Sequence, residues 1–407
     1  MNIAKSLSED SQVIDPSVDV MRVGKRLSRQ ACLTAWLLAC FLVTGCSSGG
    51  GGETSGGPPG VGASCSVAQL ESDMDSVLAT VPLDPTDTQN FSFAVERQDG
   101  RRYSYNRGTS TLQTPYESAS TSKLVSAVII LRQVERGALS LTDSPQNYIS
   151  GWPIGSSDSL YSLTLAQLMS FTSGLRTEPL CLNSGLANFE TCVNNIATTN
   201  AGNGIVPGQQ FHYGSSHLQV AGLMAVKARG VPVATWQDLF AEFQNETGLF
   251  RTAPTTAYDL PSSANPRLAG GMHWTGEEYL AFLKALKNGT LLSSTMNEFL
   301  ADHTPSPAVV IASSPIALAP PNGLGENWHY GLGHWLECPV SAGSAFTCSS
   351  STARLSSPGA YGAYPFWDRS KGYTGMVARQ GTIGTFPNGI AIERSVRLKV
   401  EQWVACQ

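Results

Sequence analysis

Ser120 and Lys123 stand three positions apart, and a hydroxyl and an ammonium at that spacing can form a site for acyl transfer. They open and close the stretch Ser120-Thr121-Ser122-Lys123, directly before the apolar run 124–131. If that run is a buried helix, both side chains lie on one face of its first turn, near free backbone N–H groups and the positive end of the helix dipole. A lysine in an apolar wall has its charged form disfavoured, so it can accept a proton near neutral pH. The spacing therefore indicates a serine nucleophile with a lysine base, and the alternative is a helix-capping serine beside a surface lysine.

Strand patterns at both ends of the chain enclose a mainly helical middle. Helical periodicity occupies residues 67–78 near the start and 391–405 near the end, and the middle, about 130–300, reads as helices and loops. This order predicts an α+β fold, with an antiparallel β-sheet flanked by N- and C-terminal helices and an inserted, mainly helical domain. The expected strands are 91–96, 102–106, 330–336, 359–367 and 373–379.

Composition agrees with a large folded domain. Of the 407 residues, 42% are hydrophobic and 14% are charged, and the net charge is −5. With no basic block in the sequence, we expect no nucleic-acid partner.

The order of several short motifs resembles the serine β-lactamase and penicillin-binding-protein superfamily over about residues 70–405. The branch it is most similar to contains class C β-lactamases, D-alanyl-D-alanine carboxypeptidases, D-aminopeptidases and lipase-like esterases. That resemblance implies the β-lactamase/transpeptidase-like fold, with Ser120 as nucleophile and Lys123 as its base or proton shuttle. The motifs that carry it are Glu117-Ser118-Ala119-Ser120-Thr121-Ser122-Lys123, Glu135-Arg136-Gly137-Ala138-Leu139-Ser140-Leu141-Thr142-Asp143, Thr172-Ser173-Gly174-Leu175, Pro207-Gly208-Gln209-Gln210-Phe211-His212-Tyr213, Ala269-Gly270-Gly271-Met272 and Tyr330-Gly331-Leu332-Gly333.

The second motif of this superfamily, Tyr-x-Asn, corresponds here to Tyr213-Gly214-Ser215. The resemblance implies that the Tyr213 phenol shares the serine's proton and passes it to the leaving group. Ser215 replaces the asparagine, and its shorter hydroxyl is expected to take the substrate-binding place. The alternative for Tyr213 is a packing tyrosine.

The third motif, Lys-Thr-Gly or His-x-Gly, corresponds to Ser357-Pro358-Gly359. The resemblance implies that Gly359 allows the backbone to approach the substrate and that the Ala360 N–H forms an oxyanion hole with that of Ser120. Ser357 stands where the cation of the motif is expected. We interpret the nearby cations Arg354, Lys371 and Arg394 as solvated surface residues.

Other candidates for the site have simpler interpretations. His212 and His217 flank Tyr213 but are interpreted as surface or satisfied core residues. Trp328, Trp335 and Trp367 are interpreted as core residues, although they could shape an apolar pocket. The sequence contains no G-x-S-x-G elbow, so an α/β-hydrolase has no support.

The N-terminal segment predicts export. A basic stretch at 22–29 follows Met21, and the apolar stretch 31–43 leads to Cys46. This is the order of a secretory signal, and its apolar part is short for a membrane span. It resembles a bacterial lipoprotein signal that is cleaved before Cys46, which then receives lipid; the alternative is an ordinary signal peptide. We expect a signal peptide over 1–46 with Met21 as the true start, a flexible Gly/Ser/Pro linker over 47–64, and the hydrolase domain over 65–407.

An exported domain with six remaining cysteines predicts disulfides. Proximity favours Cys181–Cys192 and Cys338–Cys348, which leaves Cys65–Cys406 to join the two ends of the domain. The sequence contains neither C-x-x-C nor H-E-x-x-H, so we expect no metal, and we expect no cofactor.

Two functions remain open from the sequence. The first is an exported serine hydrolase that acts on a β-lactam, an ester or a D-amino-acid peptide, lipid-anchored at the periplasmic face of the outer membrane. The second is a catalytically impaired descendant that serves as a binding protein of the cell envelope. The retention of Ser120, Lys123 and Tyr213 together favours the enzyme.

Overall fold

The computed structural model describes residues 65–252, 255–305, 308–315, 326–339 and 353–406. The predicted signal segment 1–46 with Cys46, the linker 47–64 and Cys348 lie outside these residues, so the assignments made to them stay predictions.

The main sheet brings together strands from the two ends of the chain. In the described part it is seven-stranded, in the order β10-β11-β12-β13-β14-β1-β2, and every neighbouring pair is antiparallel. The strands are β1 (Phe91–Glu96), β2 (Arg102–Arg107), β10 (Glu326–Tyr330), β11 (Trp335–Pro339), β12 (Arg354–Ser356), β13 (Tyr364–Asp368) and β14 (Tyr373–Ala378).

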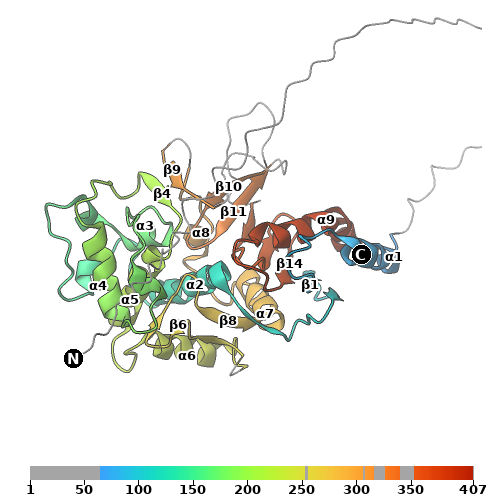
Figure 1. Cartoon of the computed structure of the whole chain (residues 1–407), viewed down its shortest axis with the longest axis horizontal. Coiled ribbons are helices and arrows are strands. Elements are labelled where there is room, and N and C mark those ends of the chain that lie inside the picture. The colour runs from blue at the N-terminus through green and yellow to red at the C-terminus, as the bar shows by residue number, and fades with distance from the viewer. Residues whose placement is uncertain (1–64, 253–254, 306–307, 316–325, 340–352, 407) are drawn as a thin grey trace, which may run out of the picture. The chain divides into compact units, whose positions relative to one another are not determined.

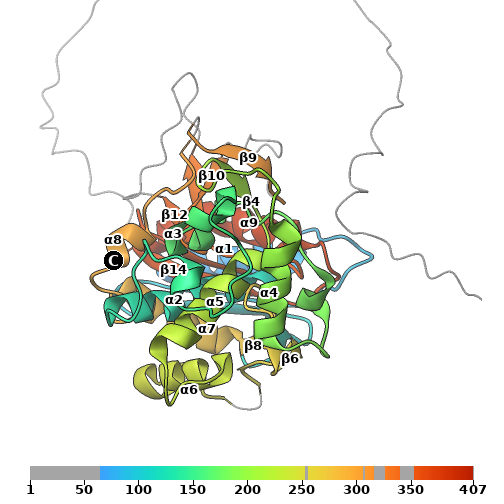
Figure 2. The same cartoon turned by 90° about the vertical axis from the view of Figure 1, so that its left-hand side faces the viewer.

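Helices cover this sheet. Figure 1 shows α1 and α9 side by side at one side of β14 and β1, with α2 and α7 on the other. In the turned view of Figure 2, α4 and α5 lie in front of β14. The predicted α+β architecture with an inserted, mainly helical domain is confirmed. The helices are α1 (Val67–Thr80), α2 (Ser122–Glu135), α3 (Leu165–Met169), α4 (Phe189–Asn200), α5 (Ser216–Arg229), α6 (Trp236–Thr247), α7 (Gly276–Lys287), α8 (Met296–Phe299) and α9 (Phe386–Ala405).

Short strands link the helical segments and the turns around the site. They form a three-stranded sheet in the order β3-β8-β5, a parallel pair β4-β9 and a hairpin β6-β7. These strands are β3 (Pro115–Glu117), β4 (Gln210–His212), β5 (Ala257–Tyr258), β6 (Pro261–Ser262), β7 (Asn265–Pro266), β8 (Met272–Thr275) and β9 (Val310–Ser313).

Helix α2 is the central element of the core. Its residues from Ser122 to Leu131 are all buried, which is the pattern of a helix surrounded by protein on every side. The helix ends at Arg136, and Gly137 follows with φ of 72° in the left-handed region. A helix enclosed in this way holds the residues of its first turn rigidly.

Two disulfides occur in the described part of the chain. Cys65–Cys406 joins the residue before α1 to the residue after α9, and Cys181–Cys192 closes a short loop. Both are among the predicted pairs.

Two predicted strands are corrected. The segment 330–336 is not one strand: β10 ends at Tyr330, residues 331–334 form a hairpin turn in which Gly333 adopts φ of 83°, and β11 begins at Trp335, which pairs with Tyr330. A Cβ at Gly333 would lie 2.4 Å from the Cβ of Ala127, so the turn packs directly on α2. Residues 359–363 are also a turn, closed by a bond from Gly362 N–H to Gly359 O at 2.9 Å, and β13 begins at Tyr364.

Candidate active site

Ser120 lies in a short 3₁₀ helix, Ala119–Thr121, that leads directly into α2. The residue before it, Ala119, has φ of 44°, a left-handed conformation that costs a residue with a side chain about 1–3 kcal/mol. The Ser120 hydroxyl is bonded to Lys123, with Nζ donating to Oγ at 2.9 Å. Ser120 therefore faces the lysine one turn along and does not serve as a helix cap.

Lys123 is buried, with 3% of its surface exposed. Its Nζ donates a second hydrogen bond, to Ala269 O at 3.0 Å, and lies 4.6 Å from the centre of the Tyr213 ring. Burial lowers the pKa of Lys123 to about 7; the charge of Arg267 lowers it further, and that of Glu178 opposes the shift. A substantial fraction of this amine is neutral near pH 7 and can accept the proton of Ser120.

Tyr213 faces Ser120 from the segment between β4 and α5. Its N–H donates to Ser313 O at 3.0 Å, and its ring stacks on Trp335 with centroids 5.3 Å apart. Burial raises the pKa of the phenol to about 12, and hydrogen bonds from Ser120 and Trp335 act in the opposite direction. Tyr213 is therefore protonated near neutral pH. The two environments separate the pKa values of Lys123 and Tyr213, so the lysine is suited to accept a proton and the tyrosine to donate one.

A small pocket of about 110 Å³ opens at the Ser120 hydroxyl. Ala360 and Tyr213 line it from two sides. In the loop after β12, the N–H groups of Ser357, Gly359 and Gly362 have backbone acceptors, whereas that of Ala360 has none among the described residues. Its N–H is free to bind a developing oxyanion. The described residues that line the pocket are Ser120, Tyr213, Pro315, Trp335, Pro358, Ala360 and Phe386.

Gly359 lets this loop approach the nucleophile. A Cβ there would lie 2.6 Å from Ser118 O, a distance that side chains do not tolerate. Ser357, which stands in place of the expected cation, is 3% exposed and donates its hydroxyl to Ser120 O at 2.9 Å. Its hydroxyl fixes the nucleophile's backbone, and it does not line the pocket.

Ser215 also takes a structural position. It precedes α5, and its N–H donates to Glu178 at 2.8 Å, as does that of Ser216. The carboxylate of Glu178 thus satisfies the first N–H groups of the helix. Ser215 is not among the residues that line the pocket.

The two histidines differ from each other. His217 is fully buried, and both ring nitrogens are bonded at 2.8 Å, Nδ1 to Ser173 Oγ and Nε2 to His212 O. Burial lowers its pKa to about 4, so it stays neutral. It is the satisfied core residue that we expected. His212 is mostly buried, and its carbonyl holds His217 in place.

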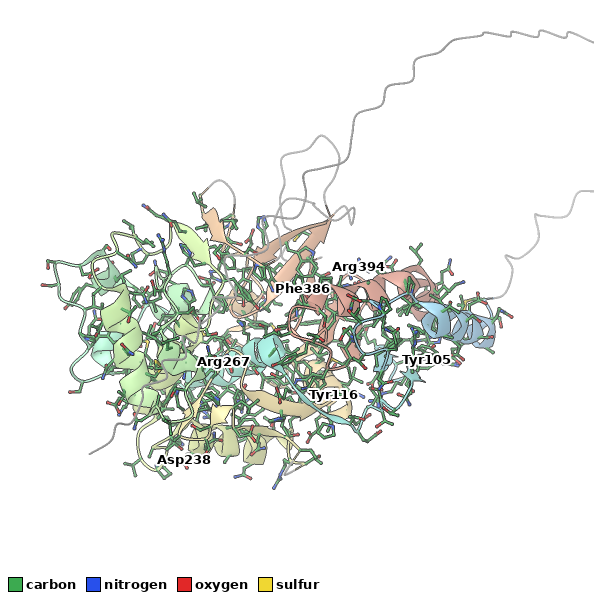
Figure 3. All side chains as sticks on the ribbon, in the orientation of Figure 1. Tyr105, Tyr116, Asp238, Arg267, Phe386 and Arg394 are labelled. Carbon is green, nitrogen blue, oxygen red and sulfur yellow. A yellow bond between two sulfur atoms is a disulfide. The ribbon has the colours of Figure 1, made fainter. Side chains whose placement is uncertain are left out.

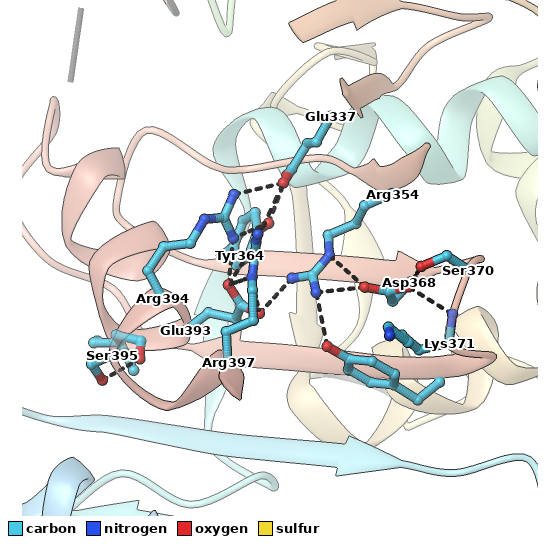
Figure 4. Close-up of polar contacts among 12 residues, drawn as sticks. Glu337, Arg354, Tyr364, Asp368, Ser370, Lys371, Glu393, Arg394, Ser395 and Arg397 are labelled. Atoms are coloured by element: carbon cyan, nitrogen blue, oxygen red, sulfur yellow. Dashed lines mark hydrogen bonds and ion pairs between the residues drawn. The ribbon is translucent and has the colours of Figure 1, made fainter. Parts of the chain in front are cut away.

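Two of the three cations near the third motif are not surface residues, which corrects the sequence interpretation. Arg354 is buried and donates to Asp368 at 2.7 Å, to Tyr373 at 2.8 Å and to Glu393 (Figure 4). Arg394 joins the same network of ion pairs. Lys371 is exposed, as expected. None of the three lines the pocket at Ser120.

Sequence reasoning missed Glu178 and Arg267 and interpreted Trp335 as core. Glu178 and Arg267 act on the pKa of Lys123, and Trp335 contacts Tyr213. Arg267 lies only two residues before the Ala269-Gly270-Gly271 motif, which was the available signal. Glu178 lies three residues after Thr172-Ser173-Gly174-Leu175, and no sequence motif marks it as a site residue.

Two searches within the described residues gave negative results. No group of three or more His, Cys, Asp or Glu residues there is arranged to hold a metal ion. None of the helices there combines the length and apolar character that a membrane span needs.

A family model described as Beta-lactamase matches residues 91–392. No curated protein matches the chain. The matched segment begins at β1, ends within α9, and includes Ser120, Lys123 and Tyr213.

Solved structures with the same fold include several hydrolases. A candidate beta-lactamase from Bacteroides dorei is 23% identical, with a TM-score of 0.61 over 82% of this chain and 99% of the other. EstCE1, a hydrolase with promiscuous acyltransferase activity, is 17% identical, with a TM-score of 0.58 over 81% and 98%. A beta-lactamase/D-alanine carboxypeptidase from Yersinia pestis is 15% identical, with a TM-score of 0.58 over 82% and 98%. At these identities the likeness shows the fold alone.

Proposed function

The chain belongs to the beta-lactamase family of serine hydrolases, and we propose on this basis that it is a serine hydrolase that forms an acyl-enzyme on Ser120. The observation that carries the proposal is the hydrogen bond of 2.9 Å between Ser120 Oγ and the Nζ of a buried lysine whose pKa lies at about 7. A pure binding protein has no need of a lysine that has been desolvated beside a serine.

The proposed reaction uses the opposite protonation states of Lys123 and Tyr213. Ser120 Oγ bonds to the substrate carbonyl carbon while its proton passes to neutral Lys123, and the Ser120 and Ala360 N–H groups stabilise the oxyanion. The bond to the leaving group then breaks, and the leaving atom takes the proton of Tyr213, which Lys123 replaces. In the second half, water attacks the acyl carbon, its proton returns through Lys123, and Ser120 leaves as the hydroxyl.

The pocket supports an ester as the acyl donor. The leaving group must lie beside Tyr213, because that residue protonates it, and the pocket there is lined mainly by Pro315, Trp335 and Phe386. No residue lining it in the described part of the chain carries a charge. A β-lactam or a D-amino-acid peptide would bring a carboxylate to this side, where Ser357 supplies no cation.

Covalent labelling tests the hydrolase proposal. We expect one fluorophosphonate adduct per chain in the intact mass of the purified protein, no adduct on Ser120→Ala, and slower or absent labelling by penicillin. Ser122→Ala is the matched control, because Ser122 is buried and bonded to Met272 N–H, and it should label as the native protein does. Absence of any adduct on the folded native protein would favour the binding-protein alternative.

We also propose that the protein is exported and lipid-anchored through Cys46 at the periplasmic face of the outer membrane. The basic and apolar order of residues 22–46 and the following Gly/Ser stretch support this. Labelled palmitate should be incorporated by the full chain and not by Cys46→Ser. Equal incorporation by both would contradict the proposal.

A further inference from the structure

Arg267 is a cation beside Ser120 that none of the superfamily motifs contains. It follows β7, and its backbone is fixed on both sides of the residue. Its N–H donates to Leu260 O at 2.8 Å, and its carbonyl accepts from Gly270 N–H at 3.0 Å and Gly271 N–H at 2.6 Å. These bonds hold the backbone of Arg267 in one position. Figure 3 shows Arg267 near the start of α2.

Gly270 shows how near the guanidinium lies to the nucleophile. A Cβ at Gly270 would lie 3.2 Å from Arg267 Nε and 3.3 Å from Nη2, and 3.5 Å from the carbonyl carbon of Ala119, which is bonded to the Ser120 nitrogen. The space of little more than one methyl group therefore separates the guanidinium from the Ser120 peptide. The charge also reaches Tyr361, the residue after Ala360: burial and Glu117 raise the pKa of Tyr361, and Arg267 opposes them.

The guanidinium is available to a ligand. It is partly exposed, and Nη1 donates to Asn183 Oδ1. No carboxylate of the described residues forms an ion pair with it, although an arginine has five N–H donors. The two carboxylates that act on neighbouring groups are already engaged. Glu117 is hydrogen-bonded to Tyr361, and Glu178 accepts from two backbone N–H groups of α5.

Arg267 lies beside the Ser120 peptide and outside the apolar pocket. The apolar pocket contains Tyr213, the proposed proton donor, so it receives the leaving group. Arg267 is not among the residues that line this pocket. With the leaving group in the pocket, the acyl chain has to extend along another side of Ser120, and the guanidinium lies close beside the Ser120 peptide outside the pocket.

We infer that Arg267 binds a carboxylate on the acyl part of the substrate, so that the preferred substrates are esters with an uncharged leaving group and an acidic acyl chain. The inference rests on the proposed hydrolase function and specifies its substrate class. A planar guanidinium with free parallel N–H groups is suited to bind a carboxylate through two hydrogen bonds.

A matched pair of esters tests the inference. The acidic substrate is mono-4-nitrophenyl adipate, and the neutral one is its methyl ester, 4-nitrophenyl methyl adipate, with enzyme-free rates subtracted. For the native protein, kcat/KM should be higher for the acid. The rates are measured at about pH 9, where the Lys123 amine is neutral with or without the charge of Arg267. Arg267→Gln should lower kcat/KM for the acid by about 10- to 100-fold, the effect of removing hydrogen bonds to a charged group, and that for the methyl ester by less than about threefold. Arg267→Lys should retain part of the preference.

Two further variants make the result specific. Arg251→Gln removes an exposed arginine elsewhere and should leave both rates unchanged. Asn183→Ala removes the acceptor that orients the guanidinium, leaves Arg267 itself intact, and should lower only the rate for the acid. Equal loss of both rates in Arg267→Gln, or equal native rates for the two esters, would overturn the inference while the hydrolase function stood. Failure to hydrolyse either ester, together with absence of a fluorophosphonate adduct, would overturn both.

Discussion

Replacement of Lys123 by methionine is expected to lower kcat/KM for 4-nitrophenyl butyrate by about a thousandfold, the middle of the range that a positioned general base contributes. Methionine has a similar length and is apolar, so the buried site should accept it and the fold should be retained. The hydrogen bonds to Ser120 Oγ and Ala269 O disappear, and no group is left to take the serine's proton. Measured ester hydrolysis, with circular dichroism to verify folding, provides the result.

The pH dependence of the rate tests whether Lys123 is the base. The pKa of Lys123 is lowered to about 7, and the neutral amine is the active form. The native rate should therefore be full above pH 7 and fall about tenfold for each unit below it. Glu178 raises this pKa, so Glu178→Gln should move the acid limb of the profile to lower pH. In Lys123→Met the limb should be absent.

Lys227→Met is the matched control, because Lys227 pairs with Glu190 on the surface of the helical segment. It should retain the native rate and profile. A native acid limb in Lys123→Met would show that another group is the base.

The second large effect concerns stability. Arg354→Met should lower the free energy of unfolding by about 3–5 kcal/mol, because it leaves the buried carboxylate of Asp368 without an ion-pair partner among the described residues. It also removes one of the arginines that pair with Glu393, which keeps Arg394 and Arg397. Figure 4 shows how Arg354 reaches both carboxylates and Tyr373 from the strand that leads to Ser357. Urea denaturation measures the change. Arg251→Met, at an exposed position, should change stability by less than about 0.5 kcal/mol.

A double variant separates loss of the ion pair from loss of packing. In Arg354→Met/Asp368→Asn the uncompensated charge of Asp368 is removed, so part of the lost stability should return. A loss below about 1 kcal/mol in the single variant would mean that water reaches these carboxylates and that the network contributes little.

The sequence predicted the fold and the nucleophile pair because both depend on local patterns. The apolar run after Lys123 is long and uninterrupted, so it had to be a buried helix, and the serine-lysine spacing then fixed one shared face. The strands 91–96 and 373–379 were predicted because both contain β-branched and aromatic residues and lie next to turn residues. By contrast, residues 330–336 were interpreted as one strand. A hairpin turn that packs on α2 contains glycine and aromatic residues, and the same composition also fits a strand.

The charged surroundings of the site could not be predicted because they depend on contacts between distant segments. Arg354 pairs with Glu393 from α9. The residues next to Arg354 in the sequence therefore gave no sign that Arg354 is buried. Glu178 and Arg267 are separated along the chain by the helices α4, α5 and α6 and act on Lys123 only in the folded protein. The sequence showed that Ser357 stands in place of a cation. Its hydrogen bond to the Ser120 carbonyl could not be predicted, because it depends on the folded structure.

The disulfide Cys65–Cys406 has a mechanical consequence. It bonds the residue before α1 to the residue after α9, so the whole domain lies within one covalent ring. A pulling force applied through the chain that precedes Cys65 reaches the bond at Cys406 and cannot peel α1 and β1 away from their neighbours one after the other. The force instead acts on α1 and α9 at once. In single-molecule stretching between residues 64 and 407, the domain with the disulfide intact should not unfold. After reduction of the disulfide, the domain should extend in steps.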